Sequence, residues 1–328
     1  MTRLIWTPEM EREAVELLGA AESQYDAWQD WQRQEPRRRS VGYETFRSRA
    51  RRLRERAAND VVANDTRPTE RLRRVLFVPD SHWPLVDRVA WNLMIQAAQA
   101  LRPDVIAVLG DYVDMASMSA HPQSDLDSES SVTSEIEQSL AGLDQLDALG
   151  ATRKIFLEGN HERRLQRQIV QRLPALHGAV SVRGMLGLEQ RGWEWHPYQR
   201  LARIGKLVIT HDMRDAGSTA VERALQKAGT DIVIGHTHAM GVVYRGDATG
   251  RRKVGAVFGH LTAPEATRYD SPVRVDHFHQ LGFGTGTLLQ DGAVVLQAHP
   301  ILVDSEGYRT VVDGKLFQIQ SQHPRSAA

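Results

Sequence analysis

Short apolar runs alternate with amphipathic stretches along most of the chain. The runs at 75–78 and 105–109 have the length of buried strands, and the segments 87–101 and 132–149 carry apolar residues at helical spacing. Later runs such as 284–289 follow one another without such helical segments. This order predicts a layered α/β domain that includes some antiparallel sheet.

The first 60 residues have a different pattern, which predicts a small all-α module. Thr7 followed by Pro8 is a typical helix start, and apolar residues then recur at helical spacing. We expect a second amphipathic helix around the aromatic residues at positions 25, 28 and 31, and a third at about 43–57.

The third predicted helix and the residues just before it are dense in arginine. Nine arginines lie between residues 37 and 56, against two glutamates. Three short helices that end in a basic one, and the segment SVGYETFRSRARRL in particular, resemble a helix-turn-helix module that binds nucleic acid. A solvated arginine-rich helix and a partner-binding segment are alternative interpretations. The arginines expected to contact phosphates are Arg47, Arg49, Arg51, Arg52 and Arg54.

These patterns divide the chain into four expected parts. Residues 1–60 form the helix-turn-helix-like basic module, and 61–71 form a polar linker. Residues 72–300 form the α/β domain, and 301–328 are a C-terminal extension.

Composition narrows the class of protein. The chain is 41% hydrophobic and 25% charged with a formal net charge of zero, which is typical of a globular protein. It has no cysteine, so any metal must be held by His, Asp, Glu or Asn. No segment approaches the ~20 apolar residues of a membrane span, and the N-terminus lacks a signal-peptide core. We therefore expect a cytoplasmic protein with no membrane partner.

Five successive apolar runs end in Asp, Asn or His. The residues that follow the runs are PDSH (79–82), GDYVD (110–114), EGNHE (158–162), HD (211–212) and GHTH (235–238). Sites in open α/β sheets form at the carboxyl ends of the strands, so we expect these five termini to converge on one point.

The residue types at these termini suit a site for two metal ions. Imidazole binds several transition metals, a carboxylate can bridge two cations, and asparagine ligates without adding charge. Gly110, Gly159 and Gly235 each precede a polar residue and would let the backbone turn closely beneath the metals. Asp80 and Asp111 could instead be helix N-caps, but their repetition at successive strand ends favours ligands.

The motifs DSH, GDYVD, GNHE, His211 and GHTH resemble, in order, the five motifs of the calcineurin-like metallophosphoesterases. The resemblance covers about residues 75–299. It implies a layered β-sandwich core flanked by helices and a hydrolase that uses two divalent metal ions. Mn²⁺ is the first expectation, with Fe, Zn, Ni or Co as alternatives. The metals would clamp the phosphoryl group and supply a hydroxide for in-line attack on phosphorus.

The resemblance also implies roles for individual residues. Asp111 would bridge the two metals, and His161 would protonate the leaving group or stabilise charge. One metal would be held by Asp80, His82 and His238, and the other by Asn160, His211 and His236.

Other polar residues near the motifs have less defined roles. Asp114 is expected to orient a ligand or the loop, and Glu162 to support the site. Arg163 and Arg164 would contact substrate phosphate or begin a solvated basic helix. Asp212 could either support the site or lie in a solvated turn. The histidines at 260, 277 and 279 are expected to be structural or exposed.

The class of phosphoester is the last expectation. GDYVD and GNHE look like protein Ser/Thr phosphatases, but that group has Arg-Gly where Met115-Ala116 stands, and it lacks the pair His236 and His238. That pair resembles the nuclease and phosphodiesterase branches. A basic module joined to such a domain is also similar to the layout of phage and prophage phosphoesterases. We therefore expect the protein in the cytoplasm of a bacterial or phage-infected cell.

We therefore expect a phosphodiesterase or nuclease that acts on DNA or RNA, with nucleic acid as its partner. A phosphomonoesterase of the protein Ser/Thr phosphatase type is the alternative. A nucleic-acid-binding regulator with an inactive hydrolase domain is a third interpretation.

Overall fold

The structure is a computed structural model that describes residues 6–20, 24–34, 36–52, 72–119, 131–246, 250–263 and 279–320. The chain divides into two compact units, Met1–Arg71 and Leu72–Ala328. Arg54, His277 and the expected linker 61–71 lie outside the described residues.

The N-terminal unit is helical, as the pattern predicts. It contains α1 (Pro8–Ala20), α2 (Gln24–Gln34), η1 (Pro36–Ser40) and a helical segment at 43–52. Thr7 begins α1, and its hydroxyl accepts a hydrogen bond from the backbone N–H of Met10 at 3.3 Å. Aromatic rings fill the centre: Trp31 is fully buried and stacks on Trp6 with ring centroids 4.5 Å apart.

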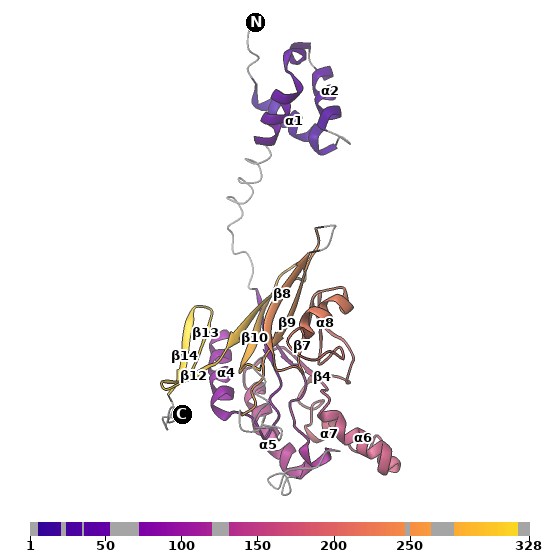
Figure 1. Cartoon of the computed structure of the whole chain (residues 1–328), viewed down its shortest axis with the longest axis vertical. Helices are drawn as coiled ribbons and strands as arrows, with labels where there is room; N and C mark the ends of the chain where they lie inside the picture. Colours follow the sequence, from indigo (N-terminus) through magenta and orange to yellow (C-terminus); the bar gives the residue numbers. More distant parts are fainter. Residues whose placement is uncertain are drawn as a thin grey trace. The chain divides into compact units, whose positions relative to one another are not determined.

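The second unit is built on a six-stranded sheet and a five-stranded sheet (Figure 1). The six-stranded sheet has the order β11-β10-β1-β2-β3-β4. Strands β1 to β4 are parallel to one another, β10 is antiparallel to β1, and β11 is antiparallel to β10. Its strands are β1 (Arg73–Val78), β2 (Val105–Val108), β3 (Arg153–Leu157), β4 (Trp193–His196), β10 (Gly282–Leu288) and β11 (Val294–Pro300).

The five-stranded sheet has the order β5-β6-β7-β9-β8, with a parallel centre and antiparallel edges. Its strands are β5 (Ala202–Ile204), β6 (Leu207–Thr210), β7 (Ile232–Ile234), β8 (Met240–Gly246) and β9 (Arg252–Phe258).

The two sheets pack face to face because alternate residues of their strands are apolar on the inner side. Phe77 from β1 stacks on Phe258 from β9 between the sheets, with centroids 5.1 Å apart. The opposite residues of β1 to β3 pack with α4 (Arg88–Leu101) and α5 (Val132–Asp147), and β6, β7 and β9 pack with α8 (Ala220–Ala228). The result is the predicted layered sandwich flanked by helices.

Residues 302–319 form a third, three-stranded sheet of β12 (Leu302–Asp304), β13 (Gly307–Val312) and β14 (Lys315–Ile319). Tyr308 and Val312 belong to the same apolar core as α4. The Tyr308 hydroxyl donates to the carboxylate of Asp87, which caps α4. This part of the C-terminal extension is therefore integral to the second unit.

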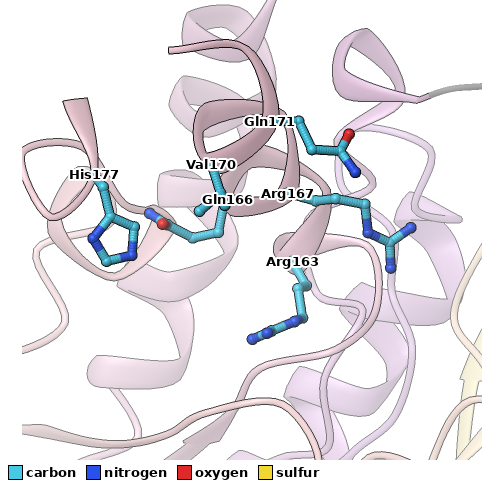
Figure 2. Close-up of a pocket in the computed structure, with 6 residues that line it drawn as sticks. All are labelled: Arg163, Gln166, Arg167, Val170, Gln171 and His177. Atoms are coloured by element: carbon cyan, nitrogen blue, oxygen red, sulfur yellow. The ribbon is translucent and has the colours of Figure 1, made fainter. Parts of the chain in front are cut away.

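Shorter elements connect the layers: η2 (Ala116–Met118), α6 (Glu162–Arg172), η4 (Pro174–Leu176) and α7 (Val182–Met185). Helix α6 begins directly after β3 and lines a small pocket together with His177 (Figure 2). None of the helices in the described part of the chain has the length and apolar character needed to cross a membrane.

Candidate metal centre

The polar strand ends meet at one edge of the sandwich. In the six-stranded sheet Val78, Val108 and Phe156 are in register, so the residues after these three parallel strands leave the sheet side by side. In the five-stranded sheet Thr210 is in register with Ile234. All of these strands present their carboxyl ends to this edge, which is where the sequence predicts the site.

The first cluster of candidate ligands contains Asp80, His82 and His238. Asp80 Oδ2 lies 3.3 Å from Nε2 of His238. The Nδ1 of His82 is 2.9 Å from the carboxylate of Asp114, so Nδ1 carries the hydrogen and Nε2 offers its lone pair. That Nε2 faces the Nε2 of His238 at 3.2 Å. Two ring nitrogens directed at one point are what a shared cation requires.

The second cluster contains Asp111, His211 and His236. The Nδ1 of His211 donates to the Leu109 carbonyl at 2.9 Å, which directs Nε2 towards the other candidate ligands. This Nε2 lies 3.3 Å from Asp111 Oδ2 and 3.0 Å from the side-chain oxygen of Asn160. The Nδ1 of His236 is buried and has no hydrogen-bond partner in the described part of the structure. An orphaned ring nitrogen beside a buried carboxylate fits a metal ligand.

The backbone approaches both clusters closely. A Cβ on Gly159 would lie 2.1 Å from Asp111 Oδ1, and one on Gly110 would lie 2.5 Å from His211 Nδ1. Four of the candidate ligands themselves have a positive φ: His82, Asp111, His236 and His238. Such conformations are uncommon for residues other than glycine and gather at functional sites. The residues and their backbone thus fit a metal-holding centre.

The buried carboxylates of Asp80 and Asp111 dominate the electrostatics of the centre. Burial alone would raise the pKa of Asp111, but His211 and His161 outweigh burial and hold it well below its usual range. Burial likewise opposes charge on His211, yet Asp111 raises the pKa of that imidazole to about 10. The carboxylates thus attract positive charge into the centre.

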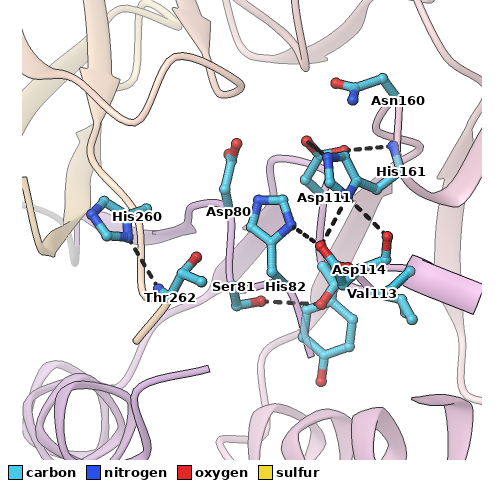
Figure 3. Close-up of polar contacts among 12 residues, drawn as sticks. Asp80, Ser81, His82, Asp111, Val113, Asp114, Asn160, His161, His260 and Thr262 are labelled. Atoms are coloured by element: carbon cyan, nitrogen blue, oxygen red, sulfur yellow. Dashed lines mark hydrogen bonds and ion pairs between the residues drawn. The ribbon is translucent and has the colours of Figure 1, made fainter. Parts of the chain in front are cut away.

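His161 and Asp114 form a third cluster with His82 (Figure 3). The Nδ1 of His161 is 2.8 Å from the Asp114 carbonyl and 3.0 Å from the Asp114 carboxylate. Arg164 also reaches the Asp114 carbonyl and approaches Nε2 of His161 at 3.1 Å. Asp114 therefore orients both His82 and His161.

Glu162 holds the loops beneath the centre. Its carboxylate accepts hydrogen bonds from the backbone N–H groups of Asp111, Val113 and Gly159. Burial and the neighbouring Asp111 raise the pKa of Glu162 to about 7. Arg163 differs from Arg164 in its partners: its guanidinium lies 3.8 Å from the Glu158 carboxylate and over the ring of Tyr198.

The structure adds His260, a residue that the motifs do not mark. His260 is buried and stacks on His238 with ring centroids 4.8 Å apart, so it is part of the wall of the centre. It follows β9, which is parallel to β7. A search for polar residues directly after apolar runs could therefore have found it. Asp212 accepts a hydrogen bond from the hydroxyl of Tyr198, whose ring lies near His211.

The N-terminal arginines lie in the other unit and differ among themselves. Arg49 forms an ion pair with Glu11 at 2.5 Å, and Arg47 reaches Glu44 at 3.6 Å. Arg51 and Arg52 are exposed, and Arg52 donates to the Ser48 carbonyl.

The profile of the calcineurin-like phosphoesterases matches residues 73–240. The chain belongs to the calcineurin-like phosphoesterase family. As a member of this family it is a metal-dependent phosphoric ester hydrolase, and the centre described above offers clusters of residues that could hold divalent metal ions.

Solved structures with a similar fold include Vps29 from Cryptosporidium parvum, at 15% identity and a TM-score of 0.39, covering 78% of this chain and 100% of that chain. The phosphoesterase Yfce from E. coli is 13% identical with a TM-score of 0.34, covering 69% of this chain and 98% of its own. Purple acid phosphatase PPD1 from yellow lupin is 13% identical with a TM-score of 0.37, covering 76% and 53%. No curated protein matches this phosphoesterase.

Proposed function

We propose that this phosphoesterase is a phosphodiesterase or nuclease that acts on DNA or RNA. The observation that carries the proposal is the basic helical segment at 43–52, where Arg51 and Arg52 are exposed and Arg47 has 56% of its side chain exposed. Exposed arginines attract backbone phosphates irrespective of sequence. A nucleic-acid-binding unit on the same chain as a phosphoesterase raises the local concentration of substrate.

The proposed metal ligands follow the two clusters. Asp80, His82 and His238 would hold one ion, and Asn160, His211 and His236 the other. Asp111 would bridge them, and its electrostatic neighbours support this because they include His211 from one cluster and His82 from the other. When bound, two divalent ions, Mn²⁺ in our proposal, neutralise charge on the phosphoryl group and activate water near neutral pH.

His161 would deliver a proton to the leaving oxygen. Asp114 fixes its ring through Nδ1, so Nε2 is the atom available to substrate. Arg164 lies against that Nε2. A substrate phosphate would draw the Arg164 guanidinium towards itself, because arginine pairs with phosphate through charge-assisted hydrogen bonds. Nε2 would then be free to hold the proton that the departing alkoxide needs.

The test compares substrates with good and poor leaving groups. Mn²⁺-reconstituted wild type and His161→Ala would be assayed on labelled DNA and RNA, bis-p-nitrophenyl phosphate and p-nitrophenyl phosphate. We expect His161→Ala to keep its metal and to lose ~10²–10⁴-fold on nucleic acid, the range for general acid catalysis. The loss on bis-p-nitrophenyl phosphate should be smaller, because p-nitrophenolate departs without a proton.

Other outcomes would change the assignment. Full activity of His161→Ala on nucleic acid would remove the proposed role of His161. Hydrolysis of the monoester alone would favour a phosphomonoesterase of the protein Ser/Thr phosphatase type. Metal binding without hydrolysis of any of these substrates would favour a nucleic-acid-binding regulator.

A further inference from the structure

Helix α6 presents an unbalanced positive surface that starts at the metal centre. It carries four arginines, at 163, 164, 167 and 172, and a single acidic residue, Glu162. Glu162 is fully buried, and its carboxylate is bonded to backbone N–H groups beneath the centre. The exposed side of α6 therefore has no acidic residue of its own to offset its arginines.

Arg163 and Arg167 stand on the same side of α6. They are four residues apart, which places them one turn and about 6 Å apart along the helix axis. Two like charges at this spacing destabilise a helix unless an anion lies close to them. The guanidinium of Arg163 lies 3.8 Å from the Glu158 carboxylate, and Arg167 makes no ion pair or hydrogen bond with the described residues.

The two arginines line one pocket. It has a volume of about 280 Å³, and Gln166, Val170, Gln171 and His177 complete its lining. Figure 2 shows Arg163 and Arg167 projecting from α6, while His177, on the segment that follows the helix, lies opposite Gln166. Gln166 connects α6 to the segment that follows it, because its amide donates to the Val180 carbonyl at 2.6 Å.

Contacts connect this pocket to the metal centre. The guanidinium of Arg163 lies over the ring of Tyr198, and that ring lies 6.3 Å from the ring of His211. On the other side of the helix start, Arg164 touches His161. A chain that has one phosphate at the metal centre can therefore continue along α6 towards Arg167.

We propose that Arg163, Arg167 and His177 form a subsite for the phosphodiester backbone beyond the scissile phosphate. Guanidinium groups pair with phosphate oxygens, and the amide of Gln171 adds a neutral donor at the rim. The inference rests on the proposed nucleic-acid substrate and adds to it the place where the flanking nucleotides bind.

Arg167→Gln in the full chain tests the subsite. Wild type and variant, loaded with Mn²⁺, would be compared on a labelled single-stranded hexanucleotide and on bis-p-nitrophenyl phosphate, which is too short to extend from the metal centre to Arg167. We expect the ratio of kcat/KM for the hexanucleotide to kcat/KM for the small diester to fall about tenfold, as for the loss of one charge-assisted hydrogen bond. The dependence of log KM on log salt should weaken by about 0.7, the value for one phosphate contact on a single strand.

Two variants serve as controls. Arg172→Gln removes the same charge from the same helix, but Arg172 lies outside this pocket, so the ratio should stay at the wild-type value. Arg167→Lys keeps the charge, so the salt dependence should return while part of the loss in kcat/KM remains. Fluorescence anisotropy of the hexanucleotide with metal-free protein gives a readout without turnover, and it should show weaker binding for Arg167→Gln.

The outcomes separate the two proposals. If wild type cleaves the hexanucleotide and Arg167→Gln cleaves and binds it equally well, the subsite is wrong and the nuclease function stands. An equal loss in Arg172→Gln would also overturn the subsite, because any positive charge on α6 would then suffice. If wild type hydrolyses the small diester but no oligonucleotide, the nucleic-acid function fails, and the subsite fails with it.

Discussion

The histidines of the metal centre and the arginines of the N-terminal unit are both dense clusters of one residue type, but they are held in different ways. His82 and His211 are buried, and each has Nδ1 fixed by a hydrogen bond so that Nε2 faces a carboxylate or another imidazole. Arg47 and Arg52 lie on the surface, where water competes for every partner.

The difference shows how much structure each cluster requires. The histidines converge because parallel strands deliver them to one edge, so moving any one ligand changes the whole centre. The arginines act as separate charges, and Arg49 is already paired with Glu11. We therefore expect single substitutions to have all-or-none effects in the centre and small, additive effects in the basic segment.

The largest expected effect comes from Asp111→Ala. Removing the carboxylate that touches His211 and the His161 backbone N–H should abolish metal binding and lower kcat by about 10³-fold or more, as for the loss of a catalytic group. Metal content by mass spectrometry and bis-p-nitrophenyl phosphate hydrolysis would be measured together. Asp291→Asn, at an exposed turn, is the matched control and should change neither. Retained metal with full turnover in Asp111→Ala would break the comparison.

The sequence locates the edge where the candidate ligands gather, because each of these residues is tied to a local signal. An apolar run that ends in a polar residue places that residue at a strand end, and Asp80, Asp111 and His211 all lie where this rule puts them. The strands that precede these residues, β1, β2 and β6, could be predicted for the same reason. His260 obeys the rule too, but its run lies among late strands outside the motifs.

Other features could not be predicted because they depend on partners distant in sequence. The pairing of Arg49 with Glu11 joins residues 38 positions apart. Edge strand β8 and the β12–β14 sheet are half exposed, so their apolar runs are broken and resemble loops. The different partners of Arg163 and Arg164 follow from the start of α6, since adjacent residues on a helix point to different sides.

A smaller effect is expected in the basic segment. Arg47→Gln with Arg52→Gln should weaken DNA binding by about tenfold at low salt and lower the salt slope, because two phosphate contacts are lost. Hydrolysis of bis-p-nitrophenyl phosphate should not change. The control is Arg33→Gln, which removes an exposed arginine from α2, where it pairs with Asp30. An equal loss of DNA binding in the control would show that net charge, not this segment, attracts nucleic acid.

The smallest effect concerns His299, a buried histidine outside the metal centre. Its Nδ1 donates to the Val311 carbonyl at 2.8 Å, and its Nε2 accepts from the Thr285 hydroxyl at 2.7 Å. Both ring nitrogens are satisfied, whereas Nδ1 of His236 has no hydrogen-bond partner among the described residues, so His299 needs no metal. Burial lowers the pKa of His299 below its ordinary value of 6.5.

The sign of the pH effect follows from this lowered pKa. Above pH ~6.5 the imidazole is neutral in both folded and unfolded chains. As the pH falls below this value, the unfolded chain binds a proton that the folded chain resists, so stability falls by at most about 1.4 kcal/mol per pH unit from this residue. His299→Gln should reduce the difference in unfolding free energy between pH 7.5 and 5.5, measured by urea denaturation of metal-free protein. An unchanged difference would mean that the protonated ring is tolerated between β11 and β13. Substituting this buried, hydrogen-bonded histidine would then affect stability no more than substituting an exposed charge of the N-terminal unit.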